Sequence, residues 1–323
     1  MSNPTPNGAQ SLIRTLVDSG VEVCFANPGT SEMHFVAALD DVPGMRAILG
    51  LFEGVATGAA DGYARIAGKP ACTLLHLGPG LGNGLANLHN ARRAHTPMVN
   101  IVGDHATYHK QYDAPLESDI DAVAGTVSSW FHRSMTPDAV PGDGARAVAE
   151  AMRAPGGVAT LILPADVCWL DSTPPAAPVT PQPAAIVPDE VIAAAARALH
   201  SDGDSVLFLG GRTLDERGQR AAVRIAQATG AKLFAEVFPR VQRRGAGLPV
   251  VERLTYLSEF AQMQIGDATS MVLVDAPSPA SFFAYPGKPS SLVPEGCAVS
   301  TLCLLYTSPS PRDRTRRRMP SSA

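Results

Sequence analysis

Long apolar runs are missing from this sequence of 323 residues. No stretch reaches the roughly 18 consecutive apolar residues that a membrane-spanning helix requires, so we expect no transmembrane segment and no membrane partner. The first eight residues also lack the basic region and apolar core that mark a secretory signal peptide. These absences predict a cytoplasmic protein.

Cysteine is scarce, and several catalytic motifs are lacking. The five cysteines show no CxxC spacing, and most lie in apolar runs, as is typical of small core residues in a reducing compartment. The sequence also lacks GxSxG, the P-loop glycine–lysine motif and HExxH. These absences argue against the hydrolases, nucleotidases and zinc proteases that carry those motifs.

Charge is low, at 17% of the residues, and unevenly distributed. The net charge is −4, although residues 312–318 contain five arginines and one aspartate. The rest of the chain is therefore acidic and gives no electrostatic attraction for nucleic acid. We interpret residues 299–323 as a non-native or disordered tail. The alternative is a basic tail that binds nucleic acid or an anionic surface.

Short apolar runs alternate with helical stretches through the first 170 residues. Nearly continuous apolar strands separated by helices are typical of a parallel sheet covered on both faces. The expected strands are 21–26, 47–51, 71–77, 98–102 and 158–163, and the expected helices are 9–18, 32–39, 54–67, 82–93 and 144–153.

A proline-rich segment, 172–188, interrupts this pattern and predicts an extended, solvated linker. The alternation then resumes, which predicts a second, smaller domain. Its expected elements are helix 189–200, strand 205–209, helix 216–229, strand 232–237, helix 251–264 and strand 271–275. We therefore predict an α/β protein with two doubly wound parallel-sheet domains, residues 1–171 and 189–298.

Glu53 is the most unusual polar residue. It lies among apolar and small residues in 50–65, where desolvation disfavours an ionised carboxylate. A functional role is one explanation. The other is a structural Glu satisfied by the first-turn amides of a helix. The spacing alone leaves both open.

Four segments are expected at the carboxyl ends of strands, where parallel sheets place their ligands. They are 25–32, the residues that lead to Glu53, the glycine-dense loop 76–84, and 102–105. In this order and spacing they resemble the thiamine-diphosphate-dependent enzymes of the acetolactate synthase and benzoylformate decarboxylase group. The matching pieces are Asn27-Pro28-Gly29, Glu53 with residues 58–65, and the loop 78–83 with the downstream segment 96–99.

The resemblance is strong over residues 8–171 and looser to about residue 297. It implies a pyrimidine-binding domain followed by a Rossmann-like central domain. It also implies that Glu53 is catalytic. In that family such a Glu bonds N1′ of the aminopyrimidine and favours the imino tautomer, which removes the thiazolium C2 proton before attack on a 2-oxo acid. The cofactor-binding residues implied with Glu53 are Asn27, Pro28, Gly29, Gly80 and Asn83.

Two further residues are candidates for contact with the substrate. His76 precedes the glycine loop, as in the decarboxylase pattern, and could move protons at the reacting carbon. Its alternative is a strand-end residue bonded to the backbone. Thr30 lies where that pattern carries a substrate-contacting serine, and its alternative is helix capping. Asp104-His105 replaces a glutamine found in many relatives, which puts the synthase's substrate contacts in doubt.

The resemblance implies thiamine diphosphate, Mg²⁺ and a homodimer or homotetramer. No diphosphate-binding segment is apparent after Gly296, so we expect the Mg²⁺ ligands outside this chain and assign no metal residues. Gly142-Asp143-Gly144 is interpreted as a chance match, and the pair His105 and His109 lacks a third ligand. FAD at the Gly210-Gly211 turn is a candidate, with a simple tight turn as the alternative.

We therefore predict a thiamine-diphosphate-dependent 2-oxo acid carboligase or decarboxylase, a transferase or lyase, that is acetolactate synthase-like. We expect this chain to be an N-terminal fragment that is inactive alone. The alternatives are a benzoylformate-type decarboxylase and a non-catalytic, two-domain cofactor-binding subunit. A third, weaker alternative is a nucleic-acid-associated protein.

Overall fold

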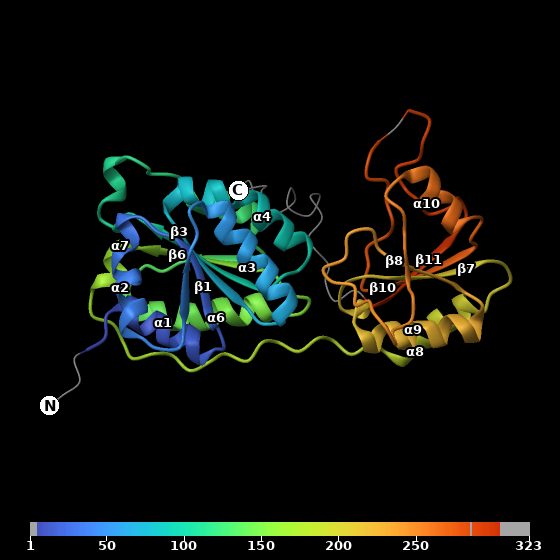
Figure 1. The fold of residues 1–323 in the computed structure, drawn as a ribbon, viewed down its shortest axis with the longest axis horizontal. Coiled ribbons are helices and arrows are strands. Elements are labelled where there is room, and N and C mark those ends of the chain that lie inside the picture. The colour runs from blue at the N-terminus through green and yellow to red at the C-terminus, as the bar shows by residue number, and fades with distance from the viewer. Residues whose placement is uncertain (1–4, 285, 304–323) are drawn as a thin grey trace, which may run out of the picture. The chain divides into compact units, whose positions relative to one another are not determined.

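The computed structural model describes residues 5–284 and 286–303, and the chain divides into two compact units between Pro183 and Ala184 (Figure 1). Each unit holds one parallel sheet with helices on both faces. The α/β class with two parallel sheets is therefore confirmed. The division falls inside the proline-rich segment 172–188. No helix among the described residues combines the length and apolarity needed to cross a membrane.

Unit 1 contains a six-stranded parallel sheet with the order β2-β1-β3-β4-β6-β5. Its strands are β1 (Val23–Asn27), β2 (Arg46–Leu49), β3 (Ala71–Leu75), β4 (Met98–Asp104), β5 (Trp130–Arg133) and β6 (Val158–Pro164). The central strands are buried along their whole length, because both faces are covered. The edge strand β5 is half exposed and was not predicted, because its Trp-Phe-His-Arg sequence does not read as a buried apolar run.

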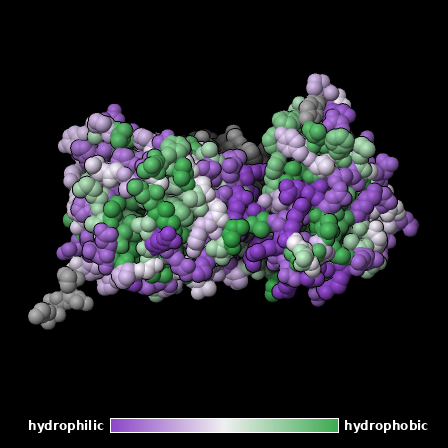
Figure 2. All heavy atoms as spheres, viewed as in Figure 1, coloured by the Kyte–Doolittle hydropathy of each residue, from purple (hydrophilic) through white to green (hydrophobic). Residues whose placement is uncertain are grey.

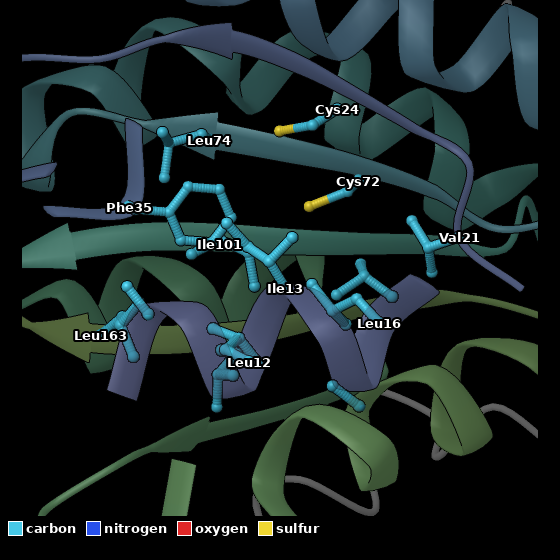
Figure 3. Close-up of a cluster of buried hydrophobic side chains, with 14 of the residues drawn as sticks. Leu12, Ile13, Leu16, Val21, Cys24, Phe35, Cys72, Leu74, Ile101 and Leu163 are labelled. Atoms are coloured by element: carbon cyan, nitrogen blue, oxygen red, sulfur yellow. The ribbon is translucent and has the colours of Figure 1, made fainter. Parts of the chain in front are cut away.

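The helices of unit 1 form two layers. One layer packs on the core that includes Leu12, Phe35 and Cys72, part of which is drawn in Figure 3. It contains α1 (Gly8–Asp18), α2 (Met33–Asp41), α6 (Val140–Met152) and α7 (Ala165–Trp169). The other layer contains α3 (Glu53–Ala67), α4 (Leu77–Arg93) and α5 (Ile120–Val127). Successive residues of β1 point to alternate layers, as the strand period requires.

Helix α4 begins earlier than predicted. Residues 78–83 were expected to form a strand-to-helix loop, but they are the first turns of α4. None of the glycines at 78, 80, 82 and 84 has a positive φ, so they do not serve a turn. Three of them instead allow close packing: an added Cβ would lie 2.2 Å from Ser118 at Gly78, and 2.9 Å from Glu53 at Gly80 or Thr57 at Gly84. Tertiary packing therefore overrides the poor helix propensity of glycine.

The first residues of the proline-rich segment are hydrogen-bonded to unit 1, although residues 173–175 and 177–180 are exposed. Ser172 is buried and donates to the carbonyl of Pro137 at 2.6 Å. The hydroxyl of Ser11 in α1 donates to the carbonyl of Thr173, and the amide of Ala176 donates to Thr15 Oγ1. The hydrogen-bonded part of the segment therefore includes residues 172–176.

Unit 2 contains a five-stranded parallel sheet with the order β11-β10-β7-β8-β9. Its strands are β7 (Ser205–Leu209), β8 (Lys232–Ala235), β9 (Glu252–Arg253), β10 (Ser270–Val274) and β11 (Ala298–Cys303). Helices α8 (Asp189–Leu199) and α9 (Glu216–Thr229) pack on one face, and α10 (Ser258–Ile265) packs on the other.

Two predictions for unit 2 are corrected. The expected helix 251–264 is helical only from Ser258, because residues 252–253 pair with β8. Residues 299–303, which were assigned to a tail, form most of β11 and pair with β10. The adjacent polar residues Ser300 and Thr301 interrupt the apolar run and hid this strand, which lies at the edge of the sheet. Residues 304–323 of the predicted tail lie outside the described residues.

Candidate functional site

Two helices begin side by side at the carboxyl edge of the unit 1 sheet. Strands β1 and β3 are neighbours, with Asn27 paired to Leu75 at their ends. Helix α3 starts at Glu53, and α4 starts at Leu77 with His76 as its N-cap. The two helices pack closely because small residues face each other, such as Thr57 against Gly84. Both helix N-termini, which favour negative charge, therefore lie near Glu53 and His76.

Glu53 is buried, with 8% of its surface exposed, at the first position of α3. Its Oε2 accepts a hydrogen bond of 3.0 Å from Asn83 Nδ2, one turn and a half into α4. Its Oε1 lies against Gly80, where an added Cβ would come within 2.9 Å. No hydrogen bond to Oε1 is present among the described residues. One carboxylate oxygen is therefore held by the protein and the other is free beside a glycine.

His76 is held by a buried carboxylate that sequence reasoning missed. Its Nδ1 lies 2.7 Å from Oε2 of Glu32, and the same oxygen accepts a 2.7 Å hydrogen bond from the amide of Gly29. The ring packs flat on Gly29, where an added Cβ would lie 2.3 Å from Cε1. The turn residue Gly29 therefore makes room for the imidazole, and the alternative of a backbone-bonded His76 does not describe this contact.

Glu32 ends the short 3₁₀ helix η1 (Thr30–Glu32) and is only 2% exposed. Desolvation raises the pKa of this carboxyl, and the hydrogen bonds from Gly29 and His76 offset only part of that effect. Its Oε1 has no hydrogen-bond partner among the described residues and lies against Gly103, which leaves no space for a Cβ. The available sequence signal was the spacing of three residues from Gly29, typical of a side chain that returns to cap a turn.

The sequence-predicted residues separate into two groups. Glu53, His76, Gly29, Gly80 and Asn83 are connected by direct contacts, because Gly80 packs on both Glu53 and the Cβ position of His76.

Asn27, Pro28 and Thr30 are connected less directly. Asn27 Nδ2 donates to the carbonyl of Gly50 at 2.8 Å, so it holds the segment that leads into α3. Pro28 lies in the turn between β1 and η1. Thr30 is exposed, and the position before η1 is Gly29, so the capping alternative for Thr30 is not observed.

Asp104 closes β4 and is 1% exposed, although it replaces the expected glutamine. Its carboxylate pairs with Lys110 Nζ at 3.1 Å and with the guanidinium of Arg133. It also accepts from the amide of His105 at 2.8 Å. Because a buried charge must be paired, Asp104 anchors the segment after β4 instead of facing a ligand.

A comparison with known families identifies unit 1. Residues 6–124 match the family described as "Thiamine pyrophosphate enzyme, N-terminal TPP binding domain". Unit 1 of this chain therefore contains a segment similar to the N-terminal domain of the thiamine pyrophosphate enzymes. The matched range includes Gly29, Glu32, Glu53, His76 and Gly80, so the site described above lies inside the thiamine pyrophosphate (thiamine diphosphate) domain.

The thiamine pyrophosphate domain and unit 2 together resemble longer proteins. The chain is 62% identical over 296 residues to the provisionally named acetolactate synthase large subunit IlvX of Mycobacterium tuberculosis, covering 92% of this chain and 57% of that protein. It is 34% identical over 157 residues to benzoylformate decarboxylase of Pseudomonas aeruginosa, covering 48% of this chain and 29% of the enzyme. The chain thus spans little more than half the length of the first relative.

Solved structures agree on the fold. The 4-hydroxybenzoylformate decarboxylase of Rhodococcus jostii superposes with a TM-score of 0.78 at 21% identity, covering 91% of this chain and 56% of that one. The benzoylformate decarboxylase of Polynucleobacter necessarius gives a TM-score of 0.78 at 22% identity, with 96% and 57% covered. At these identities the likeness concerns the fold alone.

The residues of the thiamine pyrophosphate domain fit an aminopyrimidine ring. The ring needs a carboxyl partner for one nitrogen and a flat, close approach of the backbone. Glu53 Oε1 has no partner among the described residues, and Gly80 beside it has no side chain to block access.

A metal does not fit the part of the chain that the structure describes. No group of three or more His, Cys, Asp or Glu side chains there could hold an ion. His105 and His109 have ring centroids 5.5 Å apart, and Nε2 of His105 faces the carbonyl of Pro115. Asp143 lies inside α6 and accepts from Ser134, so Gly142-Asp143-Gly144 is a helical segment.

The turn after β7 does not fit the pyrophosphate of FAD. A dinucleotide pyrophosphate binds free backbone N–H groups at such a turn. Here the amide of Gly211 donates to Glu236 Oε1 at 2.9 Å, and the amide of Arg212 donates to Asp275 Oδ2 at 2.7 Å. Two carboxylates therefore take the place that a phosphate would need.

Proposed function

We propose that this chain is part of a thiamine-diphosphate-dependent enzyme that acts on a 2-oxo acid, as a carboligase or decarboxylase. The observation that carries the proposal is Glu53: a buried carboxylate at a helix N-terminus, with one oxygen held by Asn83 and the other open beside Gly80. The family match over residues 6–124 supports the cofactor class.

Each residue of the site has a role in this proposal. Glu53 holds a proton at the pyrimidine nitrogen, and Asn83 orients Glu53. Gly80 and Gly29 keep the space beside Glu53 and His76 free of side chains.

Thr30 offers an exposed hydroxyl to the substrate carboxylate, and His76 moves a proton near the reacting carbon. Asn27 and Pro28 shape the turn before η1. The bound cofactor would supply an electron sink for the bond that breaks next to the carbonyl.

Two observations favour different reaction types. The 62% identity to a protein named as an acetolactate synthase large subunit favours a carboligase, which is a transferase. The pairing of His76 with Glu32 favours a benzoylformate-type decarboxylase, which is a lyase, because it supplies a positioned proton-transfer group. We propose the synthase-like carboligase first and the decarboxylase second.

The rest of the site lies beyond residues 5–303 in this proposal. The described residues offer no metal-binding group, so Mg²⁺ and the diphosphate would be held by other polypeptide. A homodimer or homotetramer would bring such polypeptide to Glu53. The 323-residue chain alone would then bind the cofactor weakly and have no activity. The assembled enzyme would be cytoplasmic. A non-catalytic, cofactor-binding subunit is the third candidate, because each unit has its own parallel sheet with helices on both faces.

A chimera tests the function. Residues 1–303 of this chain, which include β11, would be joined to the part of the M. tuberculosis relative that follows the equivalent strand, and assayed with pyruvate and with benzoylformate. Acetolactate formation supports the carboligase, and benzaldehyde formation supports the decarboxylase. Cofactor binding without either product supports the non-catalytic subunit. A chimera that binds no thiamine diphosphate contradicts the proposal.

A further inference from the structure

We propose that Glu32 is a positioning residue that fixes the tautomer of His76, with the ring proton on Nδ1 and Nε2 left as the functional nitrogen. This inference deepens the proposed function and rests on it for the use of His76. It concerns a residue that the sequence pattern had assigned only to the start of a helix.

The hydrogen-bond geometry at Glu32 decides which nitrogen carries the proton. Oε2 accepts from the Gly29 amide at 2.7 Å, so it already acts as an acceptor. His76 Nδ1 lies 2.7 Å from the same oxygen. A protonated Oε2 would be a poorer acceptor for the amide, whereas a carboxylate accepts two charge-assisted hydrogen bonds well. Nδ1–H therefore donates to Glu32, and the neutral ring keeps its lone pair on Nε2.

The surroundings hold Glu32 in this role. Its side chain is buried between η1 and Gly103 of β4, and Oε1 has no hydrogen-bond partner in the part of the chain that the structure describes. The imidazole packs closely on Gly29, so the ring cannot rotate freely. His76 is 23% exposed, and no hydrogen bond to Nε2 is present among the described residues. The ring nitrogen left available is therefore the one on the accessible side of the pair.

Other ionisable groups near the pair do not compete for His76. Cys168 of α7 has its thiol pKa raised by burial first and then by the charges of Glu32 and Asp166, so it stays neutral. Asp104 of β4 is paired with Lys110 and Arg133. Glu53 of α3 is bonded to Asn83 and separated from the ring by Gly80. Glu32 is thus the carboxylate that contacts the imidazole.

The test is nitrogen-15 NMR of the histidine rings in the 323-residue chain, measured without cofactor at a pH where the ring is neutral. The signal of His76 is assigned with His76→Gln. Wild-type protein is expected to show Nδ1–H, and Glu32→Ala is expected to shift the ring toward the Nε2–H form that an unbonded histidine side chain prefers. A wild-type tautomer in folded Glu32→Ala protein would overturn the proposal.

Two further variants keep the test decisive. Glu32→Gln retains the shape of the side chain but is a weaker acceptor, so the Nδ1-bound proton should move upfield; an unchanged resonance contradicts the proposal. Asp143→Ala is the matched control, because it removes the carboxylate of another histidine–carboxylate pair in unit 1, in which Asp143 lies 3.3 Å from His132. It should leave the His76 signal unchanged, and a change there would also count against the assignment. Since turnover is not measured, this result and the chimera assay can fail separately.

Discussion

Gly80 and Glu53 meet where α3 and α4 begin, so closely that a Cβ on residue 80 would lie 2.9 Å from Glu53 Oε1. The same Cβ would lie 3.4 Å from the Cβ of His76. Gly82, two residues farther along α4, is exposed and would meet nothing within 4 Å. The two glycines therefore differ in environment while sharing one helix.

Gly80→Ala and Gly82→Ala should change stability in opposite directions. Overpacking at residue 80 is expected to cost about 1–3 kcal/mol. Alanine at residue 82 is expected to stabilise the protein by up to about 1 kcal/mol, because alanine is the better helix former. Urea unfolding of both variants measures this difference. Equal stabilisation by the two substitutions would mean that Gly80 does not pack on Glu53 as described.

Glu53→Gln should separate cofactor binding from turnover in the chimera. Glutamine keeps the hydrogen-bonding shape next to Asn83 but cannot exchange a proton with a ring nitrogen. We expect cofactor binding to be retained and turnover to fall by about 10²- to 10⁴-fold, the range of a general acid–base group. Glu150→Gln, at an ion pair on α6, is the control and should keep normal turnover. Near-normal turnover of Glu53→Gln would contradict the assignment.

The parallel sheets could be predicted from the sequence because buried central strands are continuous apolar runs. The strand 205–209 and the helix 216–229 were predicted with the bounds that the structure has. The edge strand β2 lies largely within the predicted run 47–51, but two other edge strands could not be found in this way. In β5 and β11, polar and apolar residues are mixed, since one side of an edge strand has no neighbouring strand.

The site was predictable in part. Glu53 and His76 stood out because a charged or ionisable residue interrupts an apolar segment. Glu32 did not, because an acidic residue at the start of a helix is common on protein surfaces. Its burial follows from Gly103, whose lack of a side chain makes room for the carboxylate, and that contact joins two segments far apart in the chain. No local pattern reports such a contact.

Exposed apolar side chains beside Glu53 predict self-association through unit 1. Leu51 is 89% exposed, and Leu49, Phe52 and Val55 near it are exposed as well. Figure 2 shows hydrophobic residues gathered on the visible face of this unit. We expect Leu51→Glu to lower the molar mass in light scattering from a dimer or larger species toward a monomer, because an oligomer interface excludes an unpaired charge.

Val250→Glu is the matched control for that experiment, since Val250 is 92% exposed and belongs to unit 2. It should leave the molar mass unchanged. A wild-type chain that is monomeric, or a loss of association with both variants, would argue against an interface at Leu51.

The carboxylates at the turn after β7 predict that unit 2 retains no FAD. Glu236 and Asp275 accept from the two amides that a pyrophosphate would use, and their charges repel phosphate. The purified chain should lack visible flavin absorbance, and titration with FAD should give no saturable fluorescence quenching. Stoichiometric binding that ADP displaces would show that the turn rearranges to accept a nucleotide.

The raised pKa of Glu32 gives stability a pH dependence of known sign. The folded state holds the proton of this carboxyl more tightly than the unfolded chain does, where the ordinary value is 4.5. The contribution of Glu32 to stability is therefore fully present below that value and is lost as pH rises through the folded-state pKa. Wild-type protein should lose unfolding free energy relative to Glu32→Gln as the pH is raised from below 4.5 to neutral.

Glu22 gives the opposite case, because its hydrogen bond and ion pair with Lys69 lower its pKa. Wild-type protein should therefore gain stability relative to Glu22→Gln over the same pH rise, which urea unfolding across pH would measure. The same sign of change for both residues would mean that Glu32 is not desolvated in the folded protein.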